Sequence, residues 1–299
     1  LTMNYPETLA WIHGTERFGS RLGLGRMGRL LHRMGDPHLK VPYIHVAGTN
    51  GKGSTTTMIA SALTAGGFKT GKFISPFILE FRERMQIDGE MIPEETLAAL
   101  ATRLRPIAEE FKAAGDPPTE FELVTVLGLT WFAEASCDIA VLEVGLGGRL
   151  DATNIIPPPL VAVITRIDYD HTAILGDTLA AIAGEKCGIL KRGGTVICYP
   201  DQEEEALAVI RRRAAEEGDP LILPDRTVLS VLSADLTGSR ILYRGQEIFI
   251  PLPGPHQMLN TITAVEALNA LSSSRFALPP SAIAAGIAAA RFPARLELL

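Results

Sequence analysis

The sequence predicts an α/β fold, in which a mostly parallel sheet is flanked by helices and joined by a small antiparallel β subregion. Short apolar runs without polar alternation recur up to about residue 220, and stretches with helical spacing separate them. Strands of this kind are buried on both faces, as in parallel sheets covered by helices. From Leu221 onward the pattern changes to short alternating segments, which favour hairpins. A glycine-rich segment after the first strand adds a P-loop-type nucleotide site to this fold.

The composition is typical of a globular protein without nucleic-acid or membrane partners. At 299 residues, with 46% hydrophobic and 21% charged residues, the chain can bury the core of one large domain or two. Its net charge of -6 does not favour nucleic-acid binding. No apolar run is long enough to span a bilayer, and the N-terminal residues lack a signal-peptide pattern. The three cysteines form no C-x-x-C pair, so we expect free thiols and a cytoplasmic location.

The elements of the parallel region follow from apolar spacing. Residues 7–34 have helical spacing, residues 41–48 form a continuous apolar strand, and a helix over 54–65 ends at Gly66. The same alternation of strand and helix then continues along the chain. Further strands are expected at 69–75, 138–145, 160–167 and 195–200, and further helices at 94–114, 120–135, 179–190 and 202–217.

The antiparallel subregion is expected at about residues 221–253. Residues 227–251 contain short alternating segments, and turn signals at Thr237-Gly238 and Arg244-Gly245 separate them. Two further helices are expected after it, over residues 256–271 and 281–291.

The segment IHVAGTNGKGSTTT, residues 44–57, joins the first predicted strand to its helix. It departs from the usual P-loop spacing, because Val46 stands where the first glycine is expected and Gly53 follows Lys52. Phosphate binding is still predicted, since glycines let the backbone approach an anion and a helix N-terminus attracts it. Lys52 supplies a positive charge for the β- and γ-phosphates, and Ser54 or Thr55 supplies a hydroxyl for phosphate or Mg²⁺. The alternative is a plain βα turn, which does not account for the lysine and the run of hydroxyls.

A second glycine motif, GLGRMG at residues 23–28, fits the G-x-G-x-x-G pattern of dinucleotide-binding proteins. That fingerprint follows a strand and opens a helix. Here the motif follows a helical segment and lies among Arg21, Arg26 and Arg29. We therefore expect a cationic connection between helices rather than a dinucleotide site.

Polar residues stand at the predicted carboxyl ends of three strands. Glu143 interrupts an apolar strand near its end, the residues from Asp168 to His171 follow another, and Ser75 follows a third. Ligands of open α/β sheets bind beyond these ends, and a buried carboxylate needs a partner. A metal ion at Glu143 and His171 is therefore predicted. The alternatives are a salt bridge from Glu143 to Arg149 or another cation, acid–base chemistry by the neighbouring Asp and His, a structural histidine, and a simple turn at Ser75.

Together these segments resemble the folylpolyglutamate synthase/dihydrofolate synthase family of Mur-ligase-like ATP-dependent amide ligases. Residues 48–54 match the family's G-T-N-G-K-G-S loop at every position, and the order and spacing of the other motifs agree over essentially the whole chain. These motifs are SPF at 75–77, RERM at 82–85, EVGLGGRLDATN at 143–154, DHTAILGDTLAAIAGEKCGILK at 170–191, HQMLN at 256–260 and FPARLE at 292–297. Phe292 and Ala294 stand where the family pattern has Trp and Gly, a difference that concerns local packing.

The resemblance implies that ATP and Mg²⁺ bind, and it assigns roles to individual residues. Lys52, Lys186 and His171 are implied to be catalytic, and Lys186 to be carbamylated, so that it becomes an anion that helps to place the metal. The implied nucleotide-binding residues are Gly48, Thr49, Asn50, Gly51, Lys52, Gly53, Ser54, Asn260 and Arg295. The implied Mg²⁺ ligands are Ser54, Ser75, Glu143 and His171, with a second divalent or monovalent cation as an option. The implied substrate-site residues are Arg82, Asp151 and Thr153.

The activity that the resemblance implies is ATP-dependent addition of L-glutamate to a folate through an acyl-phosphate intermediate. The acceptor is tetrahydrofolate, dihydropteroate or both, and a monomer is expected. Residues 1–296 are implied to form a Mur-ligase-like ATP-binding domain, and residues 297–299 to begin a linker to a C-terminal ligase domain that this chain lacks. Two alternatives stay open: a Mur-type ligase for another acceptor, such as a peptidoglycan precursor, and an ATP-binding module without ligase activity.

Overall fold

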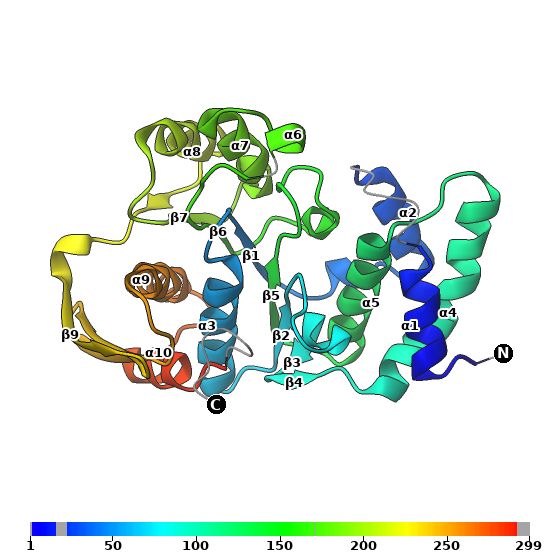
Figure 1. The fold of residues 1–299 in the computed structure, drawn as a ribbon, viewed down its shortest axis with the longest axis horizontal. Coiled ribbons are helices and arrows are strands. Elements are labelled where there is room, and N and C mark those ends of the chain that lie inside the picture. Colours follow the sequence, from blue (N-terminus) through cyan, green and yellow to red (C-terminus); the bar gives the residue numbers. More distant parts are fainter. Residues whose placement is uncertain (1, 16–22, 171, 292–299) are drawn as a thin grey trace.

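An eight-stranded sheet forms the centre of the computed structural model, which describes residues 2–15, 23–170 and 172–291 (Figure 1). Within these residues the strand order is β4-β3-β2-β5-β1-β6-β7-β8, and every neighbouring pair from β2 to β8 is parallel. The parallel strands are β1 Tyr43–Ala47, β2 Thr70–Phe73, β5 Ile139–Glu143, β6 Val161–Ile164, β7 Thr195–Cys198 and β8 Leu221–Ile222. The predicted α/β fold with a mostly parallel sheet is therefore confirmed.

A short antiparallel hairpin extends the sheet at the β2 edge. β3 (Met85–Ile87) pairs with β2 and with β4 (Glu90–Met91). Asp88 and Gly89 form its turn with φ values of 53° and 85°, as a type I′ turn requires. The apolar pattern did not predict this hairpin, because strands of two or three residues are too short to show alternation. The Asp-Gly pair was the one signal for it.

Helices cover both faces of the sheet, and the alternation of side chains along β1 shows how. Ile44 and Val46 pack into a core that they share with α3 (Lys52–Ala65), α9 (Pro255–Asn269) and α10 (Pro280–Ala288). Tyr43 belongs to the core beneath the N-terminal helices, and Ala47 to the core beneath α7 and α8. The remaining helices are α1 Tyr5–His13, α2 Gly25–Arg33, α4 Glu94–Ala113, α5 Glu120–Glu134, α6 Thr172–Leu175, α7 Leu179–Lys186 and α8 Glu204–Glu217.

The predicted helices agree with these bounds to within a few residues, with two differences. The single helical stretch predicted over 7–34 contains α1 and α2, and the structure does not describe residues 16–22 between them. The predicted 179–190 helix ends as α7 at Lys186 and continues as a short 3₁₀ turn. The 3₁₀ turns are η2 Pro37–Leu39, η3 Phe81–Arg84, η4 Ala152–Ile155, η5 Cys187–Ile189 and η6 Arg226–Val228. No helix in the described part of the chain is both long and apolar enough to span a bilayer.

The predicted antiparallel subregion is a three-stranded sheet within the described residues, but it begins at Leu229. Leu221–Ile222, expected within it, form the last parallel strand of the main sheet instead, because they pair with β7. β9 (Leu229–Asp235), β10 (Gly238–Tyr243) and β11 (Gln246–Ile250) pair in the order β11-β10-β9. This sheet lies beside α10 and α9 at the left edge of Figure 1. Ile241 and Tyr243 on β10 face the core that α3 and α9 share, and the Tyr243 hydroxyl donates to Glu266 of α9 at 2.6 Å.

Candidate functional site

The loop between β1 and α3 is held against the chain that follows β6. The backbone N–H groups of Thr49 and Asn50 both donate to the carbonyl oxygen of Arg166, at 2.8 and 3.1 Å. The Thr49 hydroxyl donates to the carbonyl oxygen of Asp168 at 3.0 Å and accepts from the Asp168 N–H at 3.1 Å. Since β1 and β6 are parallel neighbours, their carboxyl ends meet here. Hydrogen bonds thus fix the glycine-rich loop at the carboxyl edge of the sheet.

Two glycines of this loop occupy positions where no side chain fits. Gly48 has φ +151°, and a Cβ there would lie 1.8 Å from Thr165 Oγ1. Gly51 has φ +86°, and a Cβ there would lie 2.4 Å from Asn260 Oδ1. The structure therefore brings Asn260, from the start of α9, against the loop, although the two are far apart in sequence. The Asn260 side-chain amide also donates to Gln257 Oε1 at 3.0 Å, which fixes its orientation.

The N-terminus of α3 opens directly from Gly51. Because its N-cap is a glycine, α3 has no capping side chain at that residue, and the positive end of its dipole faces the loop. Lys52 is the first residue of α3, and its ammonium donates to the carbonyl oxygen of Thr49 at 3.1 Å. Ser54 follows within the first turn and is fully buried. This arrangement suits an anion with several oxygens.

Lys186 approaches the same loop from α7. Its side chain is buried, and the amine donates to the carbonyl oxygen of Gly48 at 2.8 Å. Burial, and then the charge of Lys52, lower the pKa of Lys186 to about 8, and the charge of Asp170 opposes the shift. In the sequence, only the family resemblance singles out Lys186. Its burial depends on how α7 packs on the sheet, which the local sequence does not encode.

Glu143 and Ser75 lie side by side at the ends of neighbouring strands. The Ser75 N–H donates to Glu143 Oε2 at 3.2 Å, and the glutamate is 5% exposed. Arg149, the alternative partner for Glu143, forms an ion pair with Glu185 at 2.9 Å. Lys72, also buried, adds a positive charge: burial lowers its pKa to about 8, against the charges of Glu143 and Glu83. The Glu143 carboxylate thus has the positive charge of Lys72 nearby.

The donor set at this edge fits Mg²⁺, which binds few protein oxygens and retains waters and phosphate oxygens as further ligands. Glu143 offers a carboxylate, and Ser54 and Ser75 offer hydroxyls. No group of three His, Cys, Asp or Glu side chains with metal-binding spacing occurs among the described residues. His171 and Arg295, which the resemblance also assigns to the site, lie outside the described residues.

A cavity of about 210 Å³ adjoins this edge. Ser75 lines it, so the residue that contacts Glu143 also forms part of the cavity wall. The other lining residues come from the start of α2, the start of α5 and the β5–η4 loop: Gly23, Thr119, Phe121, Glu122, Gly145, Leu146, Leu150, Asp151 and Ala152. The cavity is mostly apolar, with buried carboxylates in its wall, as is typical of a site for a ring-containing ligand.

Asp151 is held in the cavity wall by a buried hydrogen-bond chain. Its Oδ2 accepts from the Leu146 N–H at 2.8 Å, and its Oδ1 accepts from the Thr153 N–H at 2.9 Å and the Thr153 hydroxyl at 2.5 Å. Burial raises the pKa of Asp151, and these hydrogen bonds oppose the shift. The side chains of Asp151 and Thr153, which the resemblance assigns to the substrate site, are therefore brought together.

His45, on the central strand, completes this chain and was not predicted. Its Nε2 lies 2.8 Å from Thr153 Oγ1. Because the Thr153 hydroxyl gives its hydrogen to Asp151, Nε2 of His45 must be the donor. Burial, and then the charge of Lys191, lowers the pKa of His45 to about 3, so the ring is neutral. A histidine inside an apolar strand was the available signal for it.

Arg82 lies apart from these residues. Its guanidinium pairs with Glu80 and Glu94, donates to the carbonyl oxygen of Ile92 at 3.2 Å and stacks over the Tyr5 ring. It does not line the cavity that contains Asp151. The Arg82 assignment to the substrate site thus gains no support from its position.

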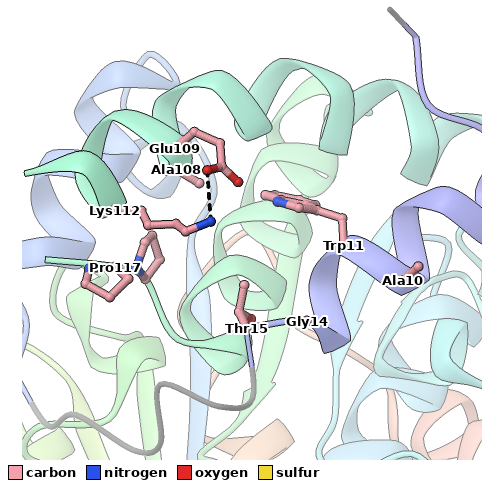
Figure 2. A pocket seen from close by; sticks show the side chains of 9 residues that line it. Ala10, Trp11, Gly14, Thr15, Ala108, Glu109, Lys112 and Pro117 are labelled. Carbon is pink, nitrogen blue, oxygen red and sulfur yellow. Dashed lines mark hydrogen bonds and ion pairs between the residues drawn. The ribbon is translucent and has the colours of Figure 1, made fainter. Parts of the chain in front are cut away.

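A second cavity, of about 170 Å³, lies between α1 and α4 (Figure 2). Trp11 and Thr15 form one side, and Glu109 and Lys112 form the other. Lys112 pairs with Glu109 at 3.2 Å, so the two charges satisfy each other. None of the strand-end residues lines this cavity.

The GLGRMG motif lies at the start of α2, which begins at Gly25. No strand precedes it in the described residues, so it lacks the strand that a dinucleotide fingerprint follows. Arg26 and Arg29 form ion pairs with acidic residues before and within α5. The expected cationic helix connection accounts for them better than a dinucleotide site.

Comparison with known proteins places these features in one family. The Mur ligase middle domain matches residues 46–268. The dihydrofolate synthase/folylpolyglutamate synthase of Bacillus subtilis (strain 168) is 39% identical over 304 residues, which cover 99% of this chain and 70% of that protein. The folylpolyglutamate synthase of Lacticaseibacillus casei is 39% identical over 308 residues, which cover 99% of this chain and 71% of that protein.

A solved structure agrees with these sequence matches. The apo form of L. casei folylpolyglutamate synthase has a TM-score of 0.90 at 38% identity, and the match covers 99% of this chain and 74% of that one. Such agreement extends the likeness from single motifs to the whole described fold. The chain belongs to the folylpolyglutamate synthase/dihydrofolate synthase family.

Proposed function

We propose that the protein is an ATP-dependent ligase that adds L-glutamate to a folate-type acceptor, either tetrahydrofolate or dihydropteroate. The observation that carries the proposal is the position of Ser75. Its N–H contacts Glu143 at the phosphate-facing edge, and the same residue lines the cavity that contains Asp151. A site for a transferring phosphoryl group and a site for an acceptor would thus share one residue.

The chemistry of amide formation explains why two such sites must adjoin. A carboxylate is a poor electrophile because its leaving group would be oxide. Transfer of the γ-phosphoryl group breaks the bond to the β-phosphate oxygen and forms an acyl phosphate on the acceptor carboxylate. The α-amine of glutamate then attacks the carbonyl carbon, the C–N bond forms, and phosphate leaves as the amine loses a proton. Catalysis of such steps depends on positioning and charge neutralisation.

The residues of the loop would supply that neutralisation. The Lys52 ammonium and the backbone N–H groups at the α3 N-terminus would bind the β- and γ-phosphates, with Asn260 fixing the loop at Gly51. Ser54, Ser75 and Glu143 would hold Mg²⁺, together with His171. When bound, this ion would reduce the negative charge that repels the incoming carboxylate.

Lys186 would contribute through its amine chemistry. With a pKa of about 8, roughly a tenth of the amine is neutral at pH 7, whereas an ordinary lysine would have far less. Only a neutral amine adds to CO₂, so the burial that lowers this pKa favours the carbamate that the family resemblance implies. A carbamate would replace the positive charge near Lys52 with a negative one.

The cavity beside Ser75 would bind the ring of the acceptor. Its volume of about 210 Å³ and the Phe121 side chain in its wall suit a flat heterocycle. The Asp151 carboxylate faces it from a fixed position and could accept hydrogen bonds from ring N–H groups. Residues 1–296 would then constitute the ATP-binding domain of the ligase.

The test is a screen for acceptor-dependent ADP release. Mg-ATP and L-glutamate are supplied with tetrahydrofolate, dihydropteroate or a UDP-muramoyl substrate, and ADP and the product are measured. We expect release with one or both folate-type acceptors. Release with the UDP-muramoyl substrate alone would favour a Mur-type ligase for another acceptor. Binding of Mg-ATP by calorimetry without any glutamate incorporation would favour an ATP-binding module.

A further inference from the structure

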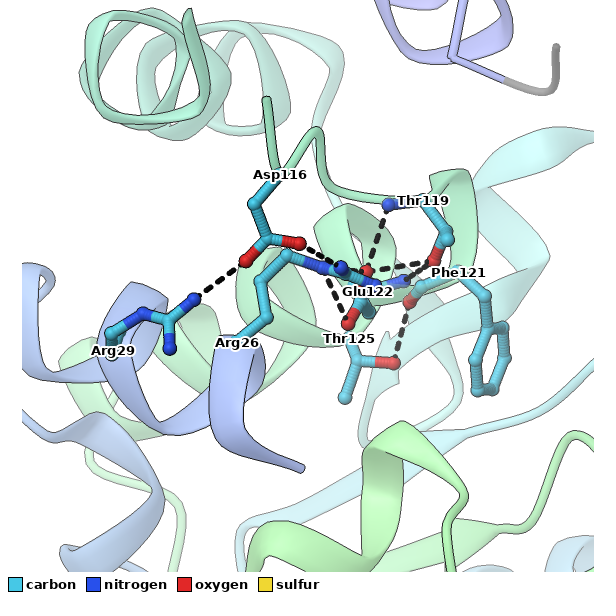
Figure 3. A network of polar contacts seen from close by, with 7 residues as sticks. All are labelled: Arg26, Arg29, Asp116, Thr119, Phe121, Glu122 and Thr125. Carbon is cyan, nitrogen blue, oxygen red and sulfur yellow. Dashed lines mark hydrogen bonds and ion pairs between the residues drawn. The ribbon is translucent and has the colours of Figure 1, made fainter. Parts of the chain in front are cut away.

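Arg26, in the GLGRMG motif, forms a buried ion pair at the wall of the acceptor cavity. Its side chain is only 9% exposed. Nε donates to both carboxylate oxygens of Glu122, at 3.0 and 2.8 Å, and Nη1 donates to Asp116 Oδ1 at 2.5 Å (Figure 3). The phosphate site uses none of these contacts, so the motif has a role that nucleotide binding does not explain.

Glu122 is also part of the cap at the start of α5. Its Oε2 accepts from the Thr119 N–H at 2.8 Å and from the Thr119 hydroxyl at 3.0 Å, while the Glu122 N–H donates back to Thr119 Oγ1 at 3.3 Å. This is a capping box, which fixes the first turn of a helix. Thr119, Phe121 and Glu122 from this turn all line the cavity. The geometry of one cavity wall therefore depends on the Glu122 carboxylate.

A second segment of the cavity wall is connected to the same ion pair. Gly23 lines the cavity and lies three residues before Arg26 in the chain, immediately ahead of α2. Arg26 thus links α2 to the first turn of α5, whose residues line the cavity (Figure 3). The Phe121 ring is held from a third side, since a Cβ at Gly145 would lie 2.5 Å from its Cζ.

The buried charge of Glu122 makes its pairing with Arg26 necessary. Glu122 is 3% exposed, and a buried carboxylate without a cation would have to turn toward water or draw water into the cavity. Either change would release Thr119 and loosen the turn that carries Phe121. With Arg26 present, both Glu122 oxygens are engaged, so this carboxylate presents no free charge to a neutral ring.

We propose that Arg26 is a positioning residue for the acceptor: its pairing with Glu122 holds the cavity wall in the form that binds the ring. This inference rests on the proposed function, in which the cavity takes the folate-type acceptor. It predicts that loss of Arg26 weakens acceptor binding and leaves nucleotide binding unchanged, because the residues of the phosphate loop make no contact with this pair in the described structure.

Arg29 provides a matched control on the same helix. It is 59% exposed and pairs at 2.6 Å with the other oxygen of Asp116, without contact to Glu122. Arg29→Gln therefore removes the same charge and the same hydrogen-bonding group from α2, but it leaves the cavity wall intact. Arg26→Lys is the conservative variant, since an ammonium keeps the charge and loses the planar fork that reaches several oxygens at once.

The experiment compares dissociation constants of wild type, Arg26→Gln, Arg26→Lys and Arg29→Gln by isothermal titration calorimetry. Dihydropteroate and tetrahydrofolate are titrated into protein saturated with Mg-AMPPCP, and Mg-ATP is titrated separately. We expect Arg26→Gln to weaken acceptor binding about tenfold or more, with an intermediate effect for Arg26→Lys. Arg29→Gln should bind the acceptor like the wild type, and all variants should bind Mg-ATP with affinity within about twofold of wild type.

The outcomes separate the role of Arg26 from the proposed function of the protein. Unchanged acceptor affinity in Arg26→Gln would overturn the role of Arg26 while leaving the proposed function intact. A parallel loss of acceptor and nucleotide binding would also overturn it, because that result describes general unfolding. If Arg26→Gln does not fold, Arg26→Lys takes its place, with the same expected split. A wild type that binds Mg-ATP and neither acceptor would contradict the proposed function itself.

Discussion

At the residue scale, burial sets the protonation of the groups that surround the candidate site. Lys52 is half-buried and keeps its ammonium close to the Thr49 carbonyl, whereas Lys186 is buried and its pKa falls to about 8. His45 is driven to its neutral form by the same effect. Desolvation favours the uncharged form of a base, so burial beside the loop brings the Lys186 amine closer to titrating at neutral pH.

Replacing Lys52 tests the phosphate assignment most simply. In Lys52→Ala we expect acceptor-dependent ADP release to fall by about a hundredfold or more, because the charge that would neutralise the transferring group is gone. Lys40→Ala serves as the control, since Lys40 is exposed and remote from the loop in the described structure. Turnover of Lys52→Ala at the wild-type rate would remove Lys52 from the mechanism.

His45 gives the protein a predictable loss of stability in acid. Its pKa is about 3 in the folded protein and about 6.5 when unfolded, so below pH 6.5 the unfolded chain binds a proton that the folded chain excludes. The free energy of unfolding should therefore fall as the pH falls from 6 to 4, by up to about 1.4 kcal/mol per pH unit from this group. Denaturant unfolding measures it.

The control for this prediction is His45→Gln, which keeps a polar side chain and does not titrate. Its free energy of unfolding should fall less steeply between pH 6 and 4 than that of the wild type, even if it is lower throughout. Comparing the two slopes cancels the contribution of Asp151, whose raised pKa acts in the opposite direction. Equal slopes would mean that His45 does not remain neutral in the folded protein.

At the element scale, the parallel strands could be predicted because they are apolar on both faces and bounded by helices. β1, β5 and β6 are fully buried along their length, and that burial is visible as mainly apolar sequence, in which His45 and Glu143 are the polar exceptions. The β3–β4 hairpin escaped prediction because its strands are too short for a pattern.

Residues of the candidate site could be predicted only where they stand at the carboxyl end of a predicted strand. Glu143 and Ser75 stand at strand ends, so topology alone brought them to one edge. Lys186 and His45 differ, because the burial of Lys186 and the contact of His45 with Thr153 come from packing between elements distant in sequence. The pairing of Arg26 with Glu122 spans 96 residues, and neither residue carries a local sign of the other.

Gly48, in the loop from β1 to α3, allows a test of how closely this loop must approach the end of β6. In Gly48→Ala the new Cβ would overlap Thr165 Oγ1, so the loop must move away from the end of β6. Gly67→Ala is the matched control, because Gly67 also has positive φ, +88°, and its Cβ would meet nothing within 4 Å. We expect Gly48→Ala to lose about 1–3 kcal/mol more stability than the control and to bind Mg-ATP more weakly.

Thermal unfolding and Mg-ATP calorimetry measure both effects for this pair. If Gly48→Ala and Gly67→Ala lose equal stability and keep equal nucleotide affinity, backbone strain alone accounts for Gly48. The close approach of the loop to Thr165 would then have no functional meaning.

At the scale of the whole molecule, the carboxyl edge of the sheet brings together the groups that the proposed reaction would need. The phosphate loop follows β1, Glu143 ends β5, Ser75 follows β2, and α9 brings Asn260 from the far end of the chain to Gly51. The cavity proposed for the acceptor adjoins Ser75, and residues just before α2 and at the start of α5 also line it. The family likeness covers 99% of this chain, so these parts belong to one shared architecture.

The measurement that tests the central claim most directly is incorporation of labelled L-glutamate into tetrahydrofolate or dihydropteroate in the presence of Mg-ATP. Product and ADP are quantified together, with Lys52→Ala as the inactive control. We predict incorporation that requires ATP, acceptor and glutamate, with one ADP released for each glutamate added. Release of ADP without incorporation into either acceptor, or incorporation that continues in Lys52→Ala, would contradict the account.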